Sequence, residues 1–383
     1  MNNGVRTLLQ VLPDLPSSSS GVGWVAAGVA SAMQARGWRV ERVTAEDVAP
    51  HAMGRTYLAV PVALAHRARR AARRLSAEGP CVVELHGFWG GVAASSLWLR
   101  RIPNVVTLFR GHGFWRAAVA VAAADDGGGG SAPNILRTLK SELTYGTLEK
   151  MATRFSDIVV VQNSSDARFA ELVDGVRPDR ILVAPPGIAA PSTVGASGRG
   201  EAIRVLWVGR RSLVKGSDFL PEIIRVLQQR RVPIDIELIG HEQVGLDAAP
   251  NLIVRPHLPR AEVAEAMARA DVFLWTSRYE GFGLAPFEAM AAGVPVISTR
   301  VGGLVDFLRD GENGIVVDRP AAPAFADAVE RFAGLDLETR QRLGAAARRA
   351  VSRLTWERHA DELDQFVCRF LDREPERWRS AAI

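Results

Sequence analysis

Two cationic side chains stand five residues apart at the point where a predicted strand, Ile203–Val208, leads into a predicted helix. These are Arg210 and Lys215, with Gly209 directly before the first and Gly216 directly after the second. Glycine lets the backbone approach a ligand, arginine binds an oxyanion through two hydrogen bonds, and lysine supplies a point charge. At the N-terminus of a helix this pattern suits a diphosphate. A surface turn in an arginine-rich protein is the alternative.

Two glutamates, separated by seven residues, follow the predicted strand Val272–Trp275. Glu280 precedes a turn, Gly281-Phe282-Gly283-Leu284, whose backbone N–H groups could bind an anion or sugar oxygens at the start of a helix. Glu288 follows on that helix, and its spacing from Pro286 predicts a first-turn position. Hydroxyl donors need acceptors, so two carboxylates beside a cationic site suit a ligand with both phosphate and hydroxyls. A first-turn charge favoured by the helix dipole is the alternative for Glu288.

Two histidines lie at predicted strand ends in the N-terminal half. His86 follows Val82–Leu85, and His112 comes shortly after Val105–Phe109. Ligands of parallel sheets bind beyond the carboxyl ends of the strands, so either imidazole could hydrogen-bond to sugar hydroxyls or to an attacking acceptor. A structural side chain with its hydrogen bonds satisfied is the alternative for each.

The elements that must position these side chains alternate between strand and helix. The predicted strands are Val5–Leu12, Arg39–Val43, Val82–Leu85, Val105–Phe109, Ile158–Gln162, Ile203–Val208, Ile234–Ile239, Val272–Trp275, Val294–Ser298 and Ile315–Val317. The predicted helices include Val25–Arg36, Asp218–Arg230 and Thr355–Leu371. This alternation favours an α/β fold with parallel sheets covered by helices on both faces.

The 383 residues are enough for two to three domains, and the pattern favours two Rossmann-like, doubly wound domains facing a cleft. The first domain is predicted over residues 1–190 and the second over residues 201–355. A linker is predicted at 191–200, within a stretch that lacks an apolar period. Residues 356–383 are predicted to form a helix that could cross back to the first domain. The glycine-rich run Asp125–Pro133 is predicted to be a mobile loop.

The composition is that of an ordinary globular protein, with 48% hydrophobic and 23% charged residues. A net charge of +5 from 47 basic and 42 acidic residues is too small to indicate a nucleic-acid partner. Two distant cysteines, Cys81 and Cys368, predict neither a disulfide framework nor a metal site. Because no signal peptide or long apolar run is evident, we expect a cytoplasmic protein, at most peripheral to the inner face of the membrane.

One basic stretch, His66–Leu75, places arginines on neighbouring stripes of a predicted helix. Such a face could meet anionic lipid head groups or a phosphorylated acceptor. A solvated helix face is the alternative interpretation.

Taken in order, the motifs resemble those of the retaining GT-B glycosyltransferases of family 4. The resemblance rests on Gly-Arg-(four residues)-Lys-Gly, on Glu-Gly-Phe-Gly-(four residues)-Glu-Ala-Met-Ala-Ala-Gly-Val-Pro-Val-Ile, on Gly302-Gly303 and on Asp310-Gly311-Glu312-Asn313-Gly314. It implies transfer of a hexose from a UDP- or GDP-sugar to a glycan, lipid-linked or small-molecule hydroxyl. It also implies retention of the anomeric configuration, no metal and no cofactor beyond the nucleotide-sugar donor.

The resemblance implies a role for each matching residue. Arg210 and Lys215 would hold the donor diphosphate, Glu280 would contact the hexose and Glu288 would bind the ribose hydroxyls. The catalytic candidates are Glu280, Arg210, Lys215, His112 and His86. The donor-binding candidates are Gly21, Gly23, Gly209, His257, Leu258, Gly281, Phe282, Gly283, Leu284 and Glu288, among which His257 and Leu258 fall where the base is held. Gly21-Val22-Gly23, after the first predicted strand, resembles the family's glycine loop that approaches the donor phosphates. The N-terminal domain would bind the acceptor.

Two other readings stay open at this stage. One is a catalytically silent GT-B-like subunit that binds a glycan or a nucleotide, and the intact set of cations and carboxylates argues against it. The other is a GT-B epimerase or phosphorylase; with three lysines in the chain, few could bind pyridoxal phosphate. The nucleotide base, the acceptor, the linkage, the identity of any catalytic histidine and the oligomeric state are not fixed by the sequence.

Overall fold

The computed structural model describes residues 6–12, 21–44, 46–47, 59–87, 99, 101–111, 147–189, 202–240 and 251–373. These residues form two compact units. The first comprises the described residues up to Gly187 together with those from Thr355 onward, and the second comprises those of Ile188–Leu354. The predicted linker, the glycine-rich run and His112 lie outside the described residues.

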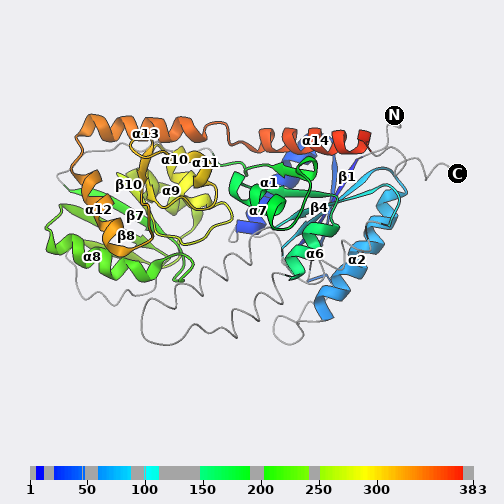
Figure 1. The fold of residues 1–383 in the computed structure, drawn as a ribbon, viewed down its shortest axis with the longest axis horizontal. Helices are drawn as coiled ribbons and strands as arrows, with labels where there is room; N and C mark the ends of the chain where they lie inside the picture. Colours follow the sequence, from blue (N-terminus) through cyan, green and yellow to red (C-terminus); the bar gives the residue numbers. More distant parts are fainter. Residues whose placement is uncertain are drawn as a thin grey trace. The chain divides into compact units, whose positions relative to one another are not determined.

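The first unit is a six-stranded parallel sheet in the order β2-β1-β3-β4-β5-β6, of which Figure 1 labels β1 and β4. Its strands are β1 (Thr7–Leu12), β2 (Arg39–Thr44), β3 (Cys81–His86), β4 (Val105–Arg110), β5 (Ile158–Val161) and β6 (Ile181–Val183). Its helices are α1 (Gly21–Ala35), α2 (Ala59–Ser76), α6 (Thr147–Phe155), α7 (Ser164–Leu172) and α14 (Trp356–Arg373).

Alternate residues of the first sheet enter cores on opposite faces. On β4, Val106 and Leu108 join the core beneath α1 and α14, whereas Val105 and Phe109 join the core beneath α2. Successive side chains of a strand point to opposite faces, so a strand covered on both sides reads as a continuous apolar run. That is why a strand such as β4 could be predicted from the sequence.

The C-terminal helix α14 is part of the first unit. Its apolar stripe, which includes Leu363, Val367 and Phe370, is buried with residues of α1 and the sheet. The backbone at Gly28 lies so close to this helix that a Cβ there would stand 2.2 Å from the Trp356 ring. Glycine at this position therefore permits α1 and α14 to pack.

The second unit is a six-stranded parallel sheet in the order β12-β11-β10-β7-β8-β9. Its strands are β7 (Ile203–Val208), β8 (Ile234–Ile239), β9 (Leu252–Arg255), β10 (Val272–Trp275), β11 (Val296–Ser298) and β12 (Gly314–Val316). Its helices are α8 (Leu220–Gln229), α9 (Arg260–Arg269), α10 (Leu284–Ala291), α11 (Leu304–Phe307), α12 (Ala322–Ala333) and α13 (Leu337–Val351).

Helices cover both faces of the second sheet as well. Figure 1 shows α8 and α12 side by side, and together with the sheet they enclose one core. Helices α9, α10 and α13 enclose the other core. The predicted α/β class with two Rossmann-like domains is therefore confirmed, and β6 and β9 are strands that the prediction missed. Among the described residues, no helix combines the length and the apolar character that a membrane span needs.

Candidate functional site

Two loops of the second unit leave the carboxyl ends of neighbouring strands. Strands β7 and β10 are paired and parallel, so the loop after β7, with Arg210 and Lys215, emerges at the same edge as the loop after β10, with Glu280. The turn at Gly302, after β11, belongs to that edge too, because β11 is the other parallel neighbour of β10. The carboxyl edge of an open parallel sheet is where ligands bind.

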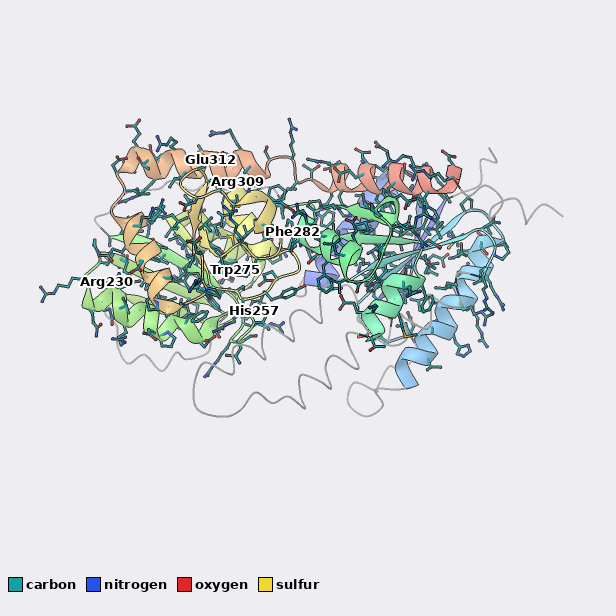
Figure 2. The ribbon with its side chains drawn as sticks, in the orientation of Figure 1. Arg230, His257, Trp275, Phe282, Arg309 and Glu312 are labelled. Atoms are coloured by element: carbon teal, nitrogen blue, oxygen red, sulfur yellow. The ribbon has the colours of Figure 1, made fainter. Side chains whose placement is uncertain are left out.

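Lys215 and Glu280 are in direct contact at this edge. The Lys215 Nζ atom lies 2.6 Å from Glu280 Oε1, and the Ser277 hydroxyl donates a hydrogen bond of 2.7 Å to the same oxygen. The ammonium also lies 4.9 Å from the centroid of the Trp275 ring, a cation–π distance. Trp275 and Phe282, which are labelled in Figure 2, lie on β10 and in the turn that follows it. The structure thus joins two predicted catalytic candidates into one ion pair.

Hydrogen bonds between the two loops fix the backbone around this pair. The Thr276 hydroxyl donates to the Lys215 carbonyl oxygen at 2.8 Å, and the buried Trp207 indole donates to the Thr276 hydroxyl at 3.0 Å. The Arg278 amide donates to the Val214 carbonyl at 2.8 Å. A buried scaffold therefore positions the Lys215 ammonium group, although the Lys215 side chain is partly exposed.

Gly216 is the tightest point of this scaffold. Its φ of 63° lies in the left-handed region, and a Cβ there would stand 2.0 Å from the Thr276 carbonyl oxygen. Only glycine fits such an approach without moving the backbone.

We expect Gly216→Ala to lower the free energy of unfolding of the second unit by about 3 kcal/mol, since it adds a backbone clash to the left-handed strain. Gly311→Ala is the matched control: φ there is 69°, but the nearest atom to a Cβ is the Arg331 Nη2 at 3.8 Å. Urea denaturation of both variants measures the difference. Equal destabilisation would contradict the clash.

Arg210 and Gly209 stand at the entrance to the same loop. The Gly209 amide donates to the Ile239 carbonyl at 3.0 Å, which joins the loop to the end of β8. Arg210 is exposed and forms no ion pair within the described part of the chain. Its guanidinium is therefore available to an anion that approaches the carboxyl edge.

The turn that was predicted to bind an anion opens helix α10. Gly283 caps this helix with a φ of 87°, and Leu284 is its first residue. The Gly303 amide donates to the Phe282 carbonyl at 2.9 Å, and a Cβ at Gly302 would stand 2.7 Å from that carbonyl oxygen. The Gly302-Gly303 motif therefore packs directly against the turn that follows Glu280.

Glu288 lies on α10, but the prediction of a first-turn position was wrong. The helix begins at Leu284, so Glu288 is its fifth residue and belongs to the second turn. Its carboxylate forms an ion pair with Arg260, the first residue of α9. Burial raises the pKa of the Glu288 carboxyl, and the charge and hydrogen bond of Arg260 oppose that rise. Sequence reasoning missed Arg260, because nothing local marks a pair that is 28 residues apart.

His257 and Leu258 lie between β9 and α9, and Pro259 separates them from Arg260. His257, labelled in Figure 2, is exposed, whereas Leu258 is half-buried against the core beneath α9 and α10. The Arg260–Glu288 pair therefore connects the segment predicted to hold the base with the residue predicted to bind the ribose.

The candidate residues of the first unit lie in environments that differ from the predicted ones. Gly21 and Gly23 were predicted to lie in a glycine loop, but the structure places both in the first turn of α1. His86 is 2% exposed and its Nε2 lies 3.1 Å from Glu84 Oε2. It thus belongs to a buried polar network and presents almost no surface to a ligand.

That network is the feature of the first unit that sequence reasoning missed. Glu84, which is fully buried, accepts hydrogen bonds from Gln10 at 2.8 Å and from the Arg110 Nε at 2.7 Å. Burial opposes ionisation of Glu84, yet the charges of His86 and Arg110 hold the pKa of its carboxyl well below the ordinary value. The one local sign of this network in the sequence was Arg110, which ends the mostly apolar strand β4.

His359 of α14 extends the network to the C-terminal helix. Its Nδ1 lies 2.8 Å from the Pro185 carbonyl oxygen and its Nε2 lies 3.3 Å from the Arg110 Nη2. Since a carbonyl can only accept and a guanidinium can only donate, these contacts assign a neutral imidazole that is protonated at Nδ1. Burial and the charge of Arg110 lower the pKa of His359 to about 4.

This pKa predicts a pH-dependent stability for the first unit. Between its folded value of about 4 and the value of about 6.5 typical of an unfolded chain, the unfolded state binds the extra proton. Stability contributed by neutral His359 is therefore present above about pH 6.5 and is lost as the pH falls towards 4, by about 3 kcal/mol. Denaturation of the His359→Gln variant across this range should show a shallower pH slope than the wild type. An unchanged slope would contradict the assignment.

Solved structures share this architecture over nearly the whole chain. Sucrose-phosphate synthase from Thermosynechococcus elongatus matches with a TM-score of 0.75 and 18% identity, covering 96% of this chain and 100% of that one. The catalytic domain of starch synthase IV from Arabidopsis thaliana, bound to ADP and acarbose, matches with a TM-score of 0.72 and 15% identity, covering 97% and 100%. At these identities the likeness shows the fold alone, which is GT-B.

Family models cover both units. Residues 20–187 match the model described as glycosyl transferase 4-like domain, and residues 197–350 match glycosyl transferases group 1. The chain therefore belongs to the family 4 GT-B glycosyltransferases, as the sequence motifs predicted.

Curated relatives include D-inositol 3-phosphate glycosyltransferases. The protein of this name from Paenarthrobacter aurescens is 34% identical over 221 residues, which are 51% of this chain and 54% of the relative. The one from Pseudarthrobacter chlorophenolicus is 35% identical over 227 residues, 53% of each chain. This chain thus spans about half the length of the curated relatives that it matches.

Proposed function

We propose that this protein is a glycosyltransferase that transfers a hexose from a nucleoside diphosphate sugar to a hydroxyl acceptor, with retention of the anomeric configuration. The observation that carries the proposal is the Lys215–Glu280 ion pair at the carboxyl edge of the second sheet. It places a fixed cation and a fixed acceptor side by side, as a ligand with both phosphate and sugar hydroxyls requires. Membership of the family supports the same assignment.

The proposed role of Lys215 and Arg210 is to stabilise the departing diphosphate. Negative charge grows on the bridging oxygen as the glycosidic bond breaks, so cations held beside it stabilise the transition state more than the ground state. Lys215 is held by Glu280 and the Thr276 scaffold, whereas the Arg210 side chain is exposed. We propose that these two cations neutralise the diphosphate without a divalent metal.

The proposed role of the two carboxylates is to accept hydrogen bonds from the donor. Glu280 Oε1 already accepts from Lys215 and Ser277, which leaves its second oxygen for a hexose hydroxyl. Glu288 would take the ribose, with the base beside His257 and Leu258. The first unit would bind the acceptor, and His112 is the candidate for contact with it, since the buried His86 presents almost no surface.

The bound molecules of the structural neighbours and the names of the relatives guide the choice of substrates. HepE from Anabaena, a fold neighbour with a TM-score of 0.65 and 14% identity, was solved with UDP and glucose, and the starch synthase with ADP. The curated relatives are named for D-inositol 3-phosphate. We propose a UDP- or GDP-hexose donor, and we include inositol phosphate among the acceptors to be tested.

The experiment that tests the function combines UDP-, GDP- and ADP-hexoses with glycan, polyprenyl phosphate and inositol phosphate acceptors. Acceptor-dependent release of nucleoside diphosphate, insensitive to EDTA, with the anomeric configuration of the product read by NMR, is the expected result. Nucleotide binding without release would favour a silent binding subunit. Isomerisation of the donor without release would favour an epimerase, and release that needs inorganic phosphate would favour a phosphorylase.

A basic surface on α2 supports a second proposal, weak contact with an anionic membrane. A depression of about 260 Å³ is lined by Arg69, Arg73, Ser76, Ala77, Arg101, Ile102, Pro103 and Asn104, a set without any carboxylate. The nearby carboxylates of Glu41 and Glu78 pair with Arg39, and Glu41 also pairs with Arg74. Of the arginines that line the depression, Arg73 and Arg101 are exposed. The cytoplasmic location expected from the sequence stays a prediction.

Vesicle sedimentation tests this contact. We expect the protein to bind phosphatidylglycerol vesicles at low salt more tightly than phosphatidylcholine vesicles, and we expect the change of Arg67, Arg70, Arg73 and Arg101 to Gln to abolish the preference. The charge-matched control changes Arg342, Arg348, Arg349 and Arg353, which are exposed in the second unit. Equal loss in both variants, or no preference in the wild type, would contradict a membrane role for α2.

A further inference from the structure

The ion pair between Arg260 and Glu288 adds a third cation to the proposed donor site, beside Arg210 and Lys215. Arg260 is the first residue of α9, and its side chain is 40% exposed, whereas the Glu288 side chain on α10 is 22% exposed. A cation at the N-terminus of a helix faces the positive end of the helix dipole, so its position there is unfavourable unless a partner compensates. Glu288 is that partner. Contacts between α9 and α10 hold the two helices together and keep the pair in place.

We propose that Arg260 is a specificity-determining residue for the donor, which makes Glu288 select a ribose with two free hydroxyls. The proposal rests on the function proposed above and extends it from the presence of a nucleotide to the identity of its sugar. Its ligand class is the ribonucleoside diphosphate, as opposed to the 2′-deoxy form.

The charge state of Glu288 is the means of selection. An ionised carboxylate offers only acceptors, so it can accept from both hydroxyls of a cis-diol, whereas a protonated carboxyl presents one donor and fewer acceptors. Burial raises the pKa of Glu288, and the charge of Arg260 opposes this rise. On the described elements that pack against α10, namely α9, α13, β10 and β11, Arg260 is the charged group that acts on this carboxylate.

Arg260 need not leave when the nucleotide binds. A carboxylate has about four lone-pair sites, and a guanidinium occupies part of them. The remaining sites can accept the two ribose hydroxyls while the ion pair persists. Removal of the 2′-hydroxyl then leaves a half-buried charge without one of its hydrogen bonds, which is a large loss for a charged acceptor.

Isothermal titration of the full chain tests the inference, with UDP, GDP and ADP and their 2′-deoxy counterparts as probes between pH 5.5 and 8.5. Of the three ribonucleotides, we expect the one that binds the wild type best to bind about 10- to 100-fold more tightly than its 2′-deoxy form. In Arg260→Ala this preference for the ribonucleotide should fall below about threefold. As the pH is lowered, ribonucleotide binding by this variant should begin to weaken at a higher pH than in the wild type. Arg260→Lys should keep most of the preference, since it keeps the charge.

The control is Arg269→Ala, which removes an exposed arginine from the last turn of the same helix. It should bind like the wild type. A wild-type ribose preference and pH profile in Arg260→Ala would overturn the role of Arg260 and leave the donor site standing. Failure of the wild type to bind any of the three ribonucleotides would overturn the donor site itself.

Discussion

Replacement of Lys215 by alanine is expected to lower the rate of nucleoside diphosphate release by about 100- to 1,000-fold while the second unit stays folded. Loss of one preorganised group that stabilises a developing negative charge has an effect of this size. The ammonium lies 2.6 Å from Glu280 and 4.9 Å from the Trp275 ring centroid, so it does not have to be ordered during the reaction. That preorganisation is what the substitution removes.

Three further measurements accompany the rate of Lys215→Ala. Lys150→Ala removes an exposed lysine of α6 and should leave the rate unchanged. Thermal unfolding of Lys215→Ala should still show a cooperative transition of the second unit, because the Glu280 side chain, which is 10% exposed, keeps its hydrogen bond from the Ser277 hydroxyl. Glu280→Ala should reduce the rate comparably, since it removes both the acceptor for the hexose and the group that orients Lys215. Rates within threefold of the wild type in both site variants would exclude this site.

Central strands of the second unit were predictable to the residue. The bounds of β7, β8 and β10 are those predicted from the sequence, because β10 is an unbroken apolar run and β7 and β8 repeat apolar residues at alternate positions. The edge strand β12 was also predicted, whereas the edge strand β9 was not. The side chains of β9 are exposed or half-buried, and Ile253 is 52% exposed. This short apolar run was not recognised as a strand.

The members of the candidate site were predictable, but their pairing was not. Spacing and strand ends placed Lys215 and Glu280 at one edge, since carboxyl ends of parallel strands share an edge. No comparable spacing in the sequence marks the pair formed by Arg260 and Glu288. An arginine at a helix N-terminus is unfavourable by itself, so its position there did not suggest a partner on another helix. Gly21 was misplaced for a related reason, since glycine lowers helix propensity and the segment was read as a loop.

Arg110 and Glu84 illustrate how much can depend on a pair that sequence does not reveal. Their side chains are 4% and 0% exposed, and the Arg110 Nε lies 2.7 Å from Glu84 Oε1. We expect Arg110→Met to destabilise the first unit by about 3–5 kcal/mol, because it leaves a buried carboxylate without its guanidinium. Hydrogen exchange of the β3 and β4 amides, compared with urea denaturation, measures the loss where it arises.

An exposed pair of similar length provides the control. Arg358 Nε lies 2.8 Å from Glu362 Oε1 on α14, and both side chains are accessible to water. Arg358→Met should therefore cost only about 0.3–0.5 kcal/mol. If Arg110→Met cost no more than this, the buried pair would not stabilise the unit.

A second variant separates charge from packing. Glu84→Gln in the Arg110→Met background removes the charge that has lost its guanidinium, while keeping an acceptor for Gln10, which donates to Glu84 Oε2 at 2.8 Å. Replacing both partners of a buried ion pair is less costly than removing one, so the double variant should be more stable than Arg110→Met alone. A double variant as unstable as the sum of the single changes would instead assign the loss to packing around β3 and β4.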